Sequence, residues 1–165
     1  MVIYRRKIST RSKTISPRSV KNIKELRAEF DRCWPWLWAS LCRFGPTHSK
    51  EQVWWRIASE AAFLWSTEKC VVLGEFIDHP IGYRSFNYWL QGPDLLEVKK
   101  LHSEIEVWAA QYGCACIAGL GRDGWGRVMD GAWEMGPRTR VKWLKPEVRA
   151  ALRKSAPDNA PGPAC

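Results

Sequence analysis

Hydrophobic and charged positions alternate most clearly between residues 95 and 133. One helical face is outlined by four apolar residues at the right spacing, Leu101, Ile105, Trp108 and Tyr112. Gly113 follows them, where a left-handed glycine commonly ends a helix. The next segment, Cys114–Leu120, holds no charge and is too short for a helix, which predicts a buried strand. A helix leading directly into a buried strand predicts an α+β (mixed α/β) domain around a mixed sheet.

The residues before this stretch predict three helices. Ser19 is a candidate cap for a first helix, whose face is made by Val20, Ile23, Leu26, Arg27 and Phe30. Pro35 interrupts that pattern, so a second helix is expected over Trp34–Phe44 with Pro35 in its first turn. A capping box of Ser49 and Gln52 predicts a third helix over Lys50–Ala61.

Three strands follow, because aromatic and β-branched residues dominate Phe63–Ser66, Cys70–Ile77 and Tyr83–Leu90. Turn-forming residues at 67–69 and 78–82 separate these segments, which predicts an antiparallel meander. The loop Gln91–Asp94 then leads to the long helix, with Asp94 placed to cap it. The amides at such a helix start attract anions, although most loops of this kind are only capped turns.

The rest of the chain predicts smaller elements. A Gly-Arg-Asp-Gly-Trp turn at 121–125 precedes another helix, two short strands are expected at 132–135 and 140–144, and one or two helical turns at 146–154. Small residues and prolines dominate 155–165, which is typical of disorder. We therefore expect a basic flexible leader at 1–18, one domain at 19–146, and a short helix with a disordered tail at 147–165.

Charge is concentrated at one end of the chain. Residues 1–24 contain eight basic and no acidic residues and thus carry most of the net charge of +9. A cationic arm of this kind can bind nucleic acid or another acidic partner by neutralising phosphates, or it can simply add solubility. The start lacks the apolar core of a secretory signal, and no apolar run approaches the roughly 20 residues of a membrane span. A cytoplasmic protein that does not enter the membrane is the expectation.

The cysteines do not form a metal-binding pattern. None of the six lies in a C-x-x-C pair, and the three histidines are far apart in the sequence, so we expect no metal site. Cys114 and Cys116 fall on one face of the predicted strand, where we expect them as buried free thiols. This usage fits a reducing compartment.

The order of predicted elements resembles the GNAT acyltransferase fold, with a mixed, mostly antiparallel sheet flanked by helices. More specifically, residues 34–144 resemble small GNAT-like proteins of tailed bacteriophages, on the strength of these matches: Trp34-Pro35, Leu64-Trp65, Glu104-x-x-x-Trp108-Ala109, Gly113-Cys114, Gly121-Arg122-Asp123-Gly124-Trp125 and Lys145. The resemblance covers about two-thirds of the chain. It implies that an acetyl group moves from acetyl-coenzyme A to the amine of a small molecule or protein.

The resemblance also implies where acetyl-coenzyme A would lie. The thioester would run along the strand Tyr83–Leu90 and the diphosphate would meet the start of the long helix, at Trp89, Leu90, Gln91, Gly92, Asp94, Leu95 and Leu96. The family's loop has glycines where this chain has Asp94 and Leu96. The tyrosine that often protonates the departing thiolate has no match in Arg127-Val128-Met129.

The central strands offer few acids or bases. Glu75 is the one acidic residue there and is the candidate general base, with Asp78 and His79 in the next turn. Glu104 and Glu106 are expected as solvated charges, and His102 is expected at the surface or at its rim. Arg122 and Trp125 are expected to pack on each other at the turn, although Arg122 also suits an acidic ligand.

Two hypotheses therefore remain. The first is a GNAT-type N-acyltransferase that uses acetyl-coenzyme A. The second is a non-catalytic protein of the same fold, a phage virion or host-takeover component in the host cytoplasm or virion, which binds a protein or nucleic acid through its basic leader. Fold alone does not choose between them.

Overall fold

The computed structural model describes residues 22–43 and 45–119. The basic leader, the 121–125 turn with Arg122 and Trp125, the short strands at 132–135 and 140–144 and the 147–165 tail lie outside the described residues. Within them the order is α1 (Ile23–Leu41), α2 (Lys50–Ala58), β1 (Phe63–Ser66), β2 (Val71–His79), β3 (Tyr83–Gln91), α3 (Leu95–Gln111) and β4 (Cys114–Gly119).

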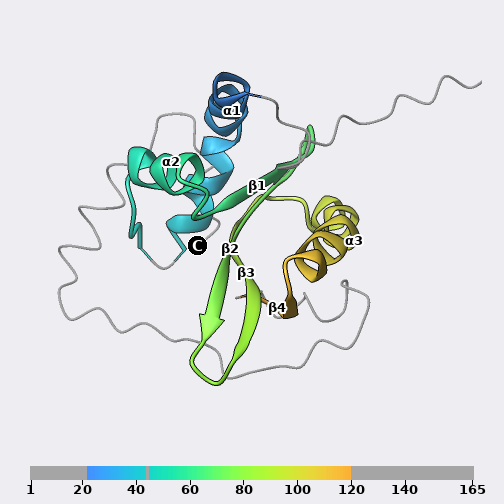
Figure 1. The fold of residues 1–165 in the computed structure, drawn as a ribbon. Helices are drawn as coiled ribbons and strands as arrows, with labels where there is room; N and C mark the ends of the chain where they lie inside the picture. Colours follow the sequence, from blue (N-terminus) through green and yellow to red (C-terminus); the bar gives the residue numbers. More distant parts are fainter. Residues whose placement is uncertain (1–21, 44, 120–165) are drawn as a thin grey trace, which may run out of the picture.

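The α+β class is confirmed. The sheet order is β1-β2-β3-β4, in which the first three strands form the predicted antiparallel meander and β4 lies parallel to β3. A parallel pair needs a crossover, and α3 provides it. Figure 1 shows α1 and α2 on one face of the sheet and α3 on the other.

Helix α1 corrects the prediction of two helices separated at Pro35. It is one helix with Pro35 inside, and it begins at the cap Asn22, whose side chain accepts from the Glu25 amide at 2.9 Å. Buried residues before and after the proline, Phe30 and Cys33 on one side and Leu37 and Leu41 on the other, hold both halves against the sheet. Packing thus outweighs the hydrogen bond that proline removes.

The predicted boundaries of other elements shift by a few residues. The capping box of α2 is confirmed, since the Gln52 amide donates to Ser49 Oγ and the Ser49 amide to Gln52 Oε1. The helix ends at Ala58 rather than Ala61, and Glu60 adopts a φ of 59°. Strand β2 starts after Cys70 and includes Asp78 and His79, which were predicted in the turn. Gly113 has the predicted left-handed conformation after α3, with a φ of 77°.

Strand β4 is less buried than predicted. Cys114 is half-buried and Cys116 is exposed, so the expectation of two buried thiols is wrong. Within the described residues, β4 pairs only with β3 and is the last strand of the sheet. The uncharged run of small residues is therefore the last strand of the described sheet.

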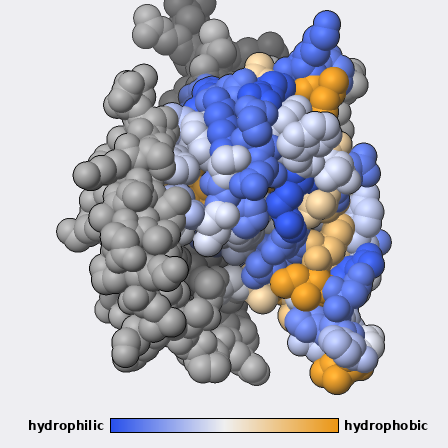
Figure 2. Space-filling model, turned by 90° about the vertical axis from the view of Figure 1, so that its left-hand side faces the viewer, coloured by the Kyte–Doolittle hydropathy of each residue, from blue (hydrophilic) through white to orange (hydrophobic). Residues whose placement is uncertain are grey.

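Each face of the sheet has its own hydrophobic core. The α1 and α2 face is filled by residues such as Phe30, Leu37, Leu41, Val53, Leu64, Leu73 and Leu90. The α3 face is largely aromatic and includes Trp65, Phe86, Tyr88, Ile105 and Trp108. Over the helices the surface in Figure 2 is mainly hydrophilic, and hydrophobic residues are exposed at the lower end, where the β2–β3 hairpin projects. No helix within the described ranges is long and apolar enough to cross a membrane.

Candidate functional site

The end of β3 is irregular on the edge that pairs with β2. Opposite β2, Leu73 pairs with Leu90 but Gly74 pairs with Tyr88, so Trp89 is an extra residue that forms a bulge. Opposite β4, the last described pair joins Tyr88 to Gly119, which is the last residue that the structure describes. Bulges are common next to active sites, where they redirect a side chain or end strand pairing.

A polar cluster surrounds Trp89 on the α1 and α2 face. The Arg56 guanidinium from α2 lies 5.0 Å from the Trp89 ring centre and forms an ion pair with Glu75 of β2. His48, in the loop between α1 and α2, meets the Trp89 ring edge-on at 4.9 Å between ring centres. The structure thus brings together Glu75 and Trp89, two residues singled out from the sequence, through Arg56, which was not.

His48 is neutral at neutral pH in this cluster. Burial lowers its pKa, the Arg56 cation lowers it further, and only Glu75 acts in the opposite direction. Its Nδ1 lies 2.8 Å from Thr47 Oγ1. In addition, the Arg56 Nε–H is buried and has no hydrogen-bond partner among the described residues. An unsatisfied buried donor is costly, so the cluster is incomplete without a further acceptor.

Asp78 and His79 lie away from Trp89, at the opposite end of β3. The Asp78 carboxylate accepts from Arg84 Nε at 2.6 Å, and His79 Nε2 lies 2.9 Å from Ser85 Oγ. The His79 ring also stacks on Tyr83. These side chains stabilise the β2–β3 hairpin and do not join the cluster around Trp89.

The start of α3 is capped as predicted. One Asp94 carboxylate oxygen accepts from the Leu96 amide at 2.9 Å and from the Glu97 amide at 3.2 Å. Beside it lies an open hollow of about 510 Å³ lined by Lys69, Pro93, Asp94, Leu95 and Leu96. The hollow therefore combines a carboxylate, a lysine and a helix start, and it includes three of the predicted cofactor residues.

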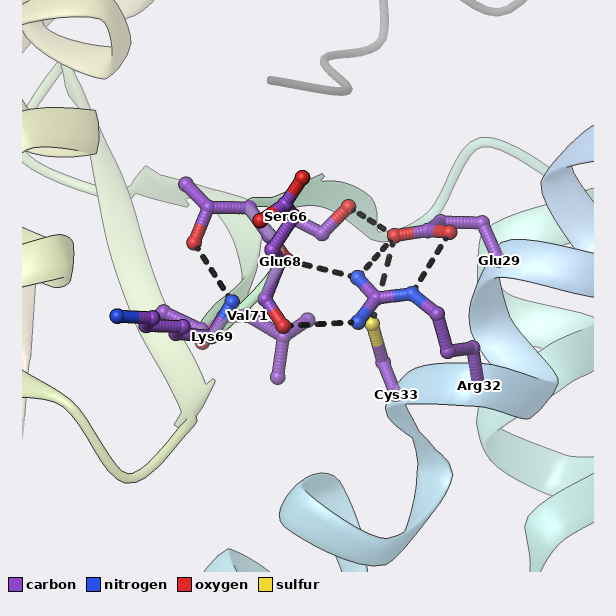
Figure 3. A network of polar contacts seen from close by, with 9 residues as sticks. Glu29, Arg32, Cys33, Ser66, Glu68, Lys69 and Val71 are labelled. Atoms are coloured by element: carbon purple, nitrogen blue, oxygen red, sulfur yellow. Dashed lines mark hydrogen bonds and ion pairs between the residues drawn. The ribbon is translucent and has the colours of Figure 1, made fainter. Parts of the chain in front are cut away.

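A polar network holds the β1–β2 turn that carries Lys69. Glu29 of α1 accepts from Ser66 Oγ at 2.5 Å and pairs with Arg32, which donates to the carbonyl oxygens of Thr67 and Glu68. Figure 3 shows these contacts and the Lys69 side chain pointing away from them. In the part of the chain that the structure describes, Lys69 has no ion-pair partner, so its charge is available at the hollow.

The remaining predicted cofactor residues are used by the fold. Leu90 belongs to the core beneath α1, and the Gln91 amide donates to Ser40 Oγ at 3.3 Å. The Gly92 amide donates to the Val71 carbonyl at 2.6 Å, and a Cβ at Gly92 would lie 2.7 Å from the Val71 amide nitrogen. Glycine is therefore required at 92 by the close approach of β2, which the sequence did not reveal.

The opposite face holds a buried polar chain that sequence reasoning missed. The Tyr88 hydroxyl lies 2.6 Å from His102 Nδ1, and His102 Nε2 lies 3.2 Å from Glu106 Oε1. His102 is buried, so the expectation that it lies at the surface or at its rim is wrong; Glu106 is exposed as expected. Burial lowers the pKa of His102 and raises that of Tyr88. The i, i+4 spacing of His102 and Glu106 was the available signal.

The described cysteines and carboxylates do not form a metal centre. The structure, over residues 22–43 and 45–119, holds no cluster of three metal-ligating side chains. Burial raises the pKa of Cys33 and of Cys70 to about 12, so both thiols stay protonated and are poor nucleophiles. Comparisons with models of protein families, with curated proteins and with solved structures found no match for this chain.

Proposed function

We propose that this chain is a GNAT-type N-acyltransferase that moves an acetyl group from acetyl-coenzyme A to an amine. The observation that carries the proposal is the geometry around β3: a parallel β3–β4 pair joined by a helix, and a bulge at Trp89 on the other edge of β3. This is where the resemblance places the thioester. Beside it the cluster of His48, Arg56 and Glu75 supplies groups that can position an amine and take its proton.

The diphosphate of the coenzyme would bind in the hollow at the start of α3. Lys69 offers a cation there, and the helix start offers its dipole. Asp94 opposes diphosphate binding, because its carboxylate already accepts hydrogen bonds from the amides of Leu96 and Glu97. The residues present therefore suit a diphosphate through Lys69 and the helix dipole, with Asp94 lowering the affinity.

Calorimetric titration with acetyl-coenzyme A tests the proposal. Lys69→Gln is expected to weaken binding about fivefold, the effect of one exposed charge pair worth about 1 kcal/mol. Asp94→Asn keeps a good helix cap but removes the negative charge, so it is expected to strengthen binding by a similar factor. Lys24→Gln removes a charge from an exposed residue of α1 and is the matched control, so it should leave acetyl-coenzyme A binding unchanged. No binding at millimolar acetyl-coenzyme A would refute the proposal.

A second candidate function is favoured by the carboxylates of Asp94 and Glu75. Asp94 already accepts from the amides of α3, and Glu75 is already paired with Arg56. This arrangement also suits a non-catalytic protein of phage type that binds an acidic partner or nucleic acid through its basic leader. Deleting residues 1–24 is then expected to abolish salt-sensitive polynucleotide binding, measured by fluorescence anisotropy over a range of salt concentrations. Unchanged binding would remove the leader from this role.

A further inference from the structure

A histidine that the sequence did not single out lies beside the bulge of β3. The His48 ring packs edge-on against Trp89, the extra residue that forms the bulge of β3 opposite β2. We propose that His48, rather than Glu75, is the general base that takes the proton from the acceptor amine. This inference rests on the acyltransferase function proposed above and names a residue for its proton transfer.

Glu75 is poorly placed to act as the base. Its Oε2 already accepts from the Arg56 guanidinium, and the same guanidinium covers the face of Trp89 at 5.0 Å. An amine approaching Trp89 thus meets the Arg56 cation before it meets the Glu75 carboxylate. Glu75 is a positioning residue for Arg56 and, through Arg56, for the indole.

His48 has the properties that a base requires. Two charged side chains face it, Arg56 from α2 and Glu75 from β2, and burial together with Arg56 keeps the imidazole neutral. When Nδ1 carries the proton and donates to Thr47 Oγ1, Nε2 holds a free lone pair. A neutral imidazole held in place by a neighbouring hydroxyl can act as a general base.

The unpaired Arg56 Nε–H indicates how an acceptor would be held. This donor is buried beside Trp89 and lacks a partner in the described part of the chain. A carbonyl or carboxylate oxygen near the reacting amine would satisfy it. The acceptor class that fits the cluster is therefore an amine that also carries such an oxygen, as in an amino acid or a peptide.

The proton and bond changes balance as follows. His48 Nε2 takes one proton from the acceptor ammonium and later releases it to solvent. The freed nitrogen lone pair forms the N–C bond with the acetyl carbonyl carbon. The C–S bond breaks and its electron pair leaves with sulfur, which takes the second proton from the nitrogen. The products are the amide and the free thiol of coenzyme A.

The experiment compares wild type with His48→Gln, using His79→Gln as the matched control because His79 lies at the hairpin end. Calorimetry with acetyl-coenzyme A comes first, and we expect equal binding in all three proteins. Thiol release is then measured against pH with a lysine-containing peptide. His48→Gln should lower the rate about 10²–10⁴-fold and remove the inflection of the pH profile, while His79→Gln keeps both. NMR titration of the His48 Cε1–H signal should give a pKa below 6.5 that matches that inflection.

The possible failures are separable. Absence of acetyl-coenzyme A binding in wild type refutes the proposed function itself. If wild type binds acetyl-coenzyme A, three results overturn the role of His48: no thiol release above the uncatalysed rate, an unchanged rate and pH profile in His48→Gln, or a His48 pKa at or above 6.5. Circular dichroism and intact acetyl-coenzyme A binding by His48→Gln exclude misfolding as the cause of a lost rate.

Discussion

The two faces of the sheet use the same strands but are built from different chemistry. Under α3, aromatic rings pack on one another: Phe76 stacks on Trp108 at 5.2 Å, and Trp65 meets both Phe86 and Trp108 edge-on. Under α1 and α2 the core mixes aliphatic residues with Phe30, Trp34 and Trp38, and beside the bulge of β3 it meets the charged side chains of Arg56 and Glu75.

This difference distinguishes a closely packed face from the face that holds the candidate site. The α3 face is packed mainly from aromatic rings that contact one another, and its buried Trp65 Nε1–H also lacks a partner among the described residues. The other face combines the Arg56 Nε–H, unpaired within the described residues, with a half-buried histidine beside the bulge of β3. Functional residues commonly lie where the regular pattern of a fold is interrupted.

The largest effect is expected from the aromatic face. Trp65 is fully buried and contacts Phe86 and Trp108. Trp65→Ala should lower the free energy of unfolding by about 3–5 kcal/mol, because it leaves a large cavity. Urea denaturation measures this value. The matched change on the other face, Trp89→Ala, should cost clearly less because Trp89 is only half-buried; equal losses would contradict the division between the faces.

Gly74→Ala tests how tightly the same face is packed. A Cβ there would overlap the Phe86 ring and lie 2.9 Å from the Asn87 carbonyl oxygen. Since the backbone oxygen cannot move away easily, we expect a loss of about 1–3 kcal/mol in the free energy of unfolding. Gly82→Ala is a poor control because Gly82 has a φ of 94°. Ala118→Gly on β4 adds no atoms and serves as the control instead. A neutral effect of Gly74→Ala in thermal denaturation would show that Phe86 moves aside.

The buried His102 should make stability depend on pH. Burial holds the pKa of His102 below its ordinary value of 6.5, so below pH 6.5 the unfolded chain binds the proton first. The free energy of unfolding should therefore decrease as pH falls from 6.5, by about 1 kcal/mol per pH unit, until the native pKa is reached. Chemical denaturation at several pH values measures this slope. His102→Gln should flatten that part of the curve, and an identical slope in both proteins would argue against this assignment.

The smallest stability effect is expected from the Arg56–Glu75 pair. Their side chains are 39% and 20% exposed, so solvent screens the interaction. A double-mutant cycle with Arg56→Gln and Glu75→Gln should give a coupling energy below about 1 kcal/mol. A coupling of several kcal/mol would place this pair with the structural contacts of the α3 face rather than with the ligand-binding groups.

Much of the fold was predictable because its signals are local. The capping box at Ser49, the cap at Asp94, the glycine after α3 and the three-strand meander each depend on residues a few positions apart. The site was harder to predict because its members come from the α1–α2 loop, α2, β2 and β3. Nothing in the sequence around His48 or Arg56 indicates that both contact Trp89.

The sequence by itself determined most of the described elements, their order and the α+β class, since hydrophobic periodicity and caps act within one segment. Only the tertiary structure decided that α1 continues through Pro35, that β4 ends the described sheet and that Gly92 serves a close strand contact. The tertiary structure also decided that the Glu75 carboxylate forms an ion pair with Arg56. In each case the deciding energy comes from contacts between residues distant in the chain, which no local pattern encodes.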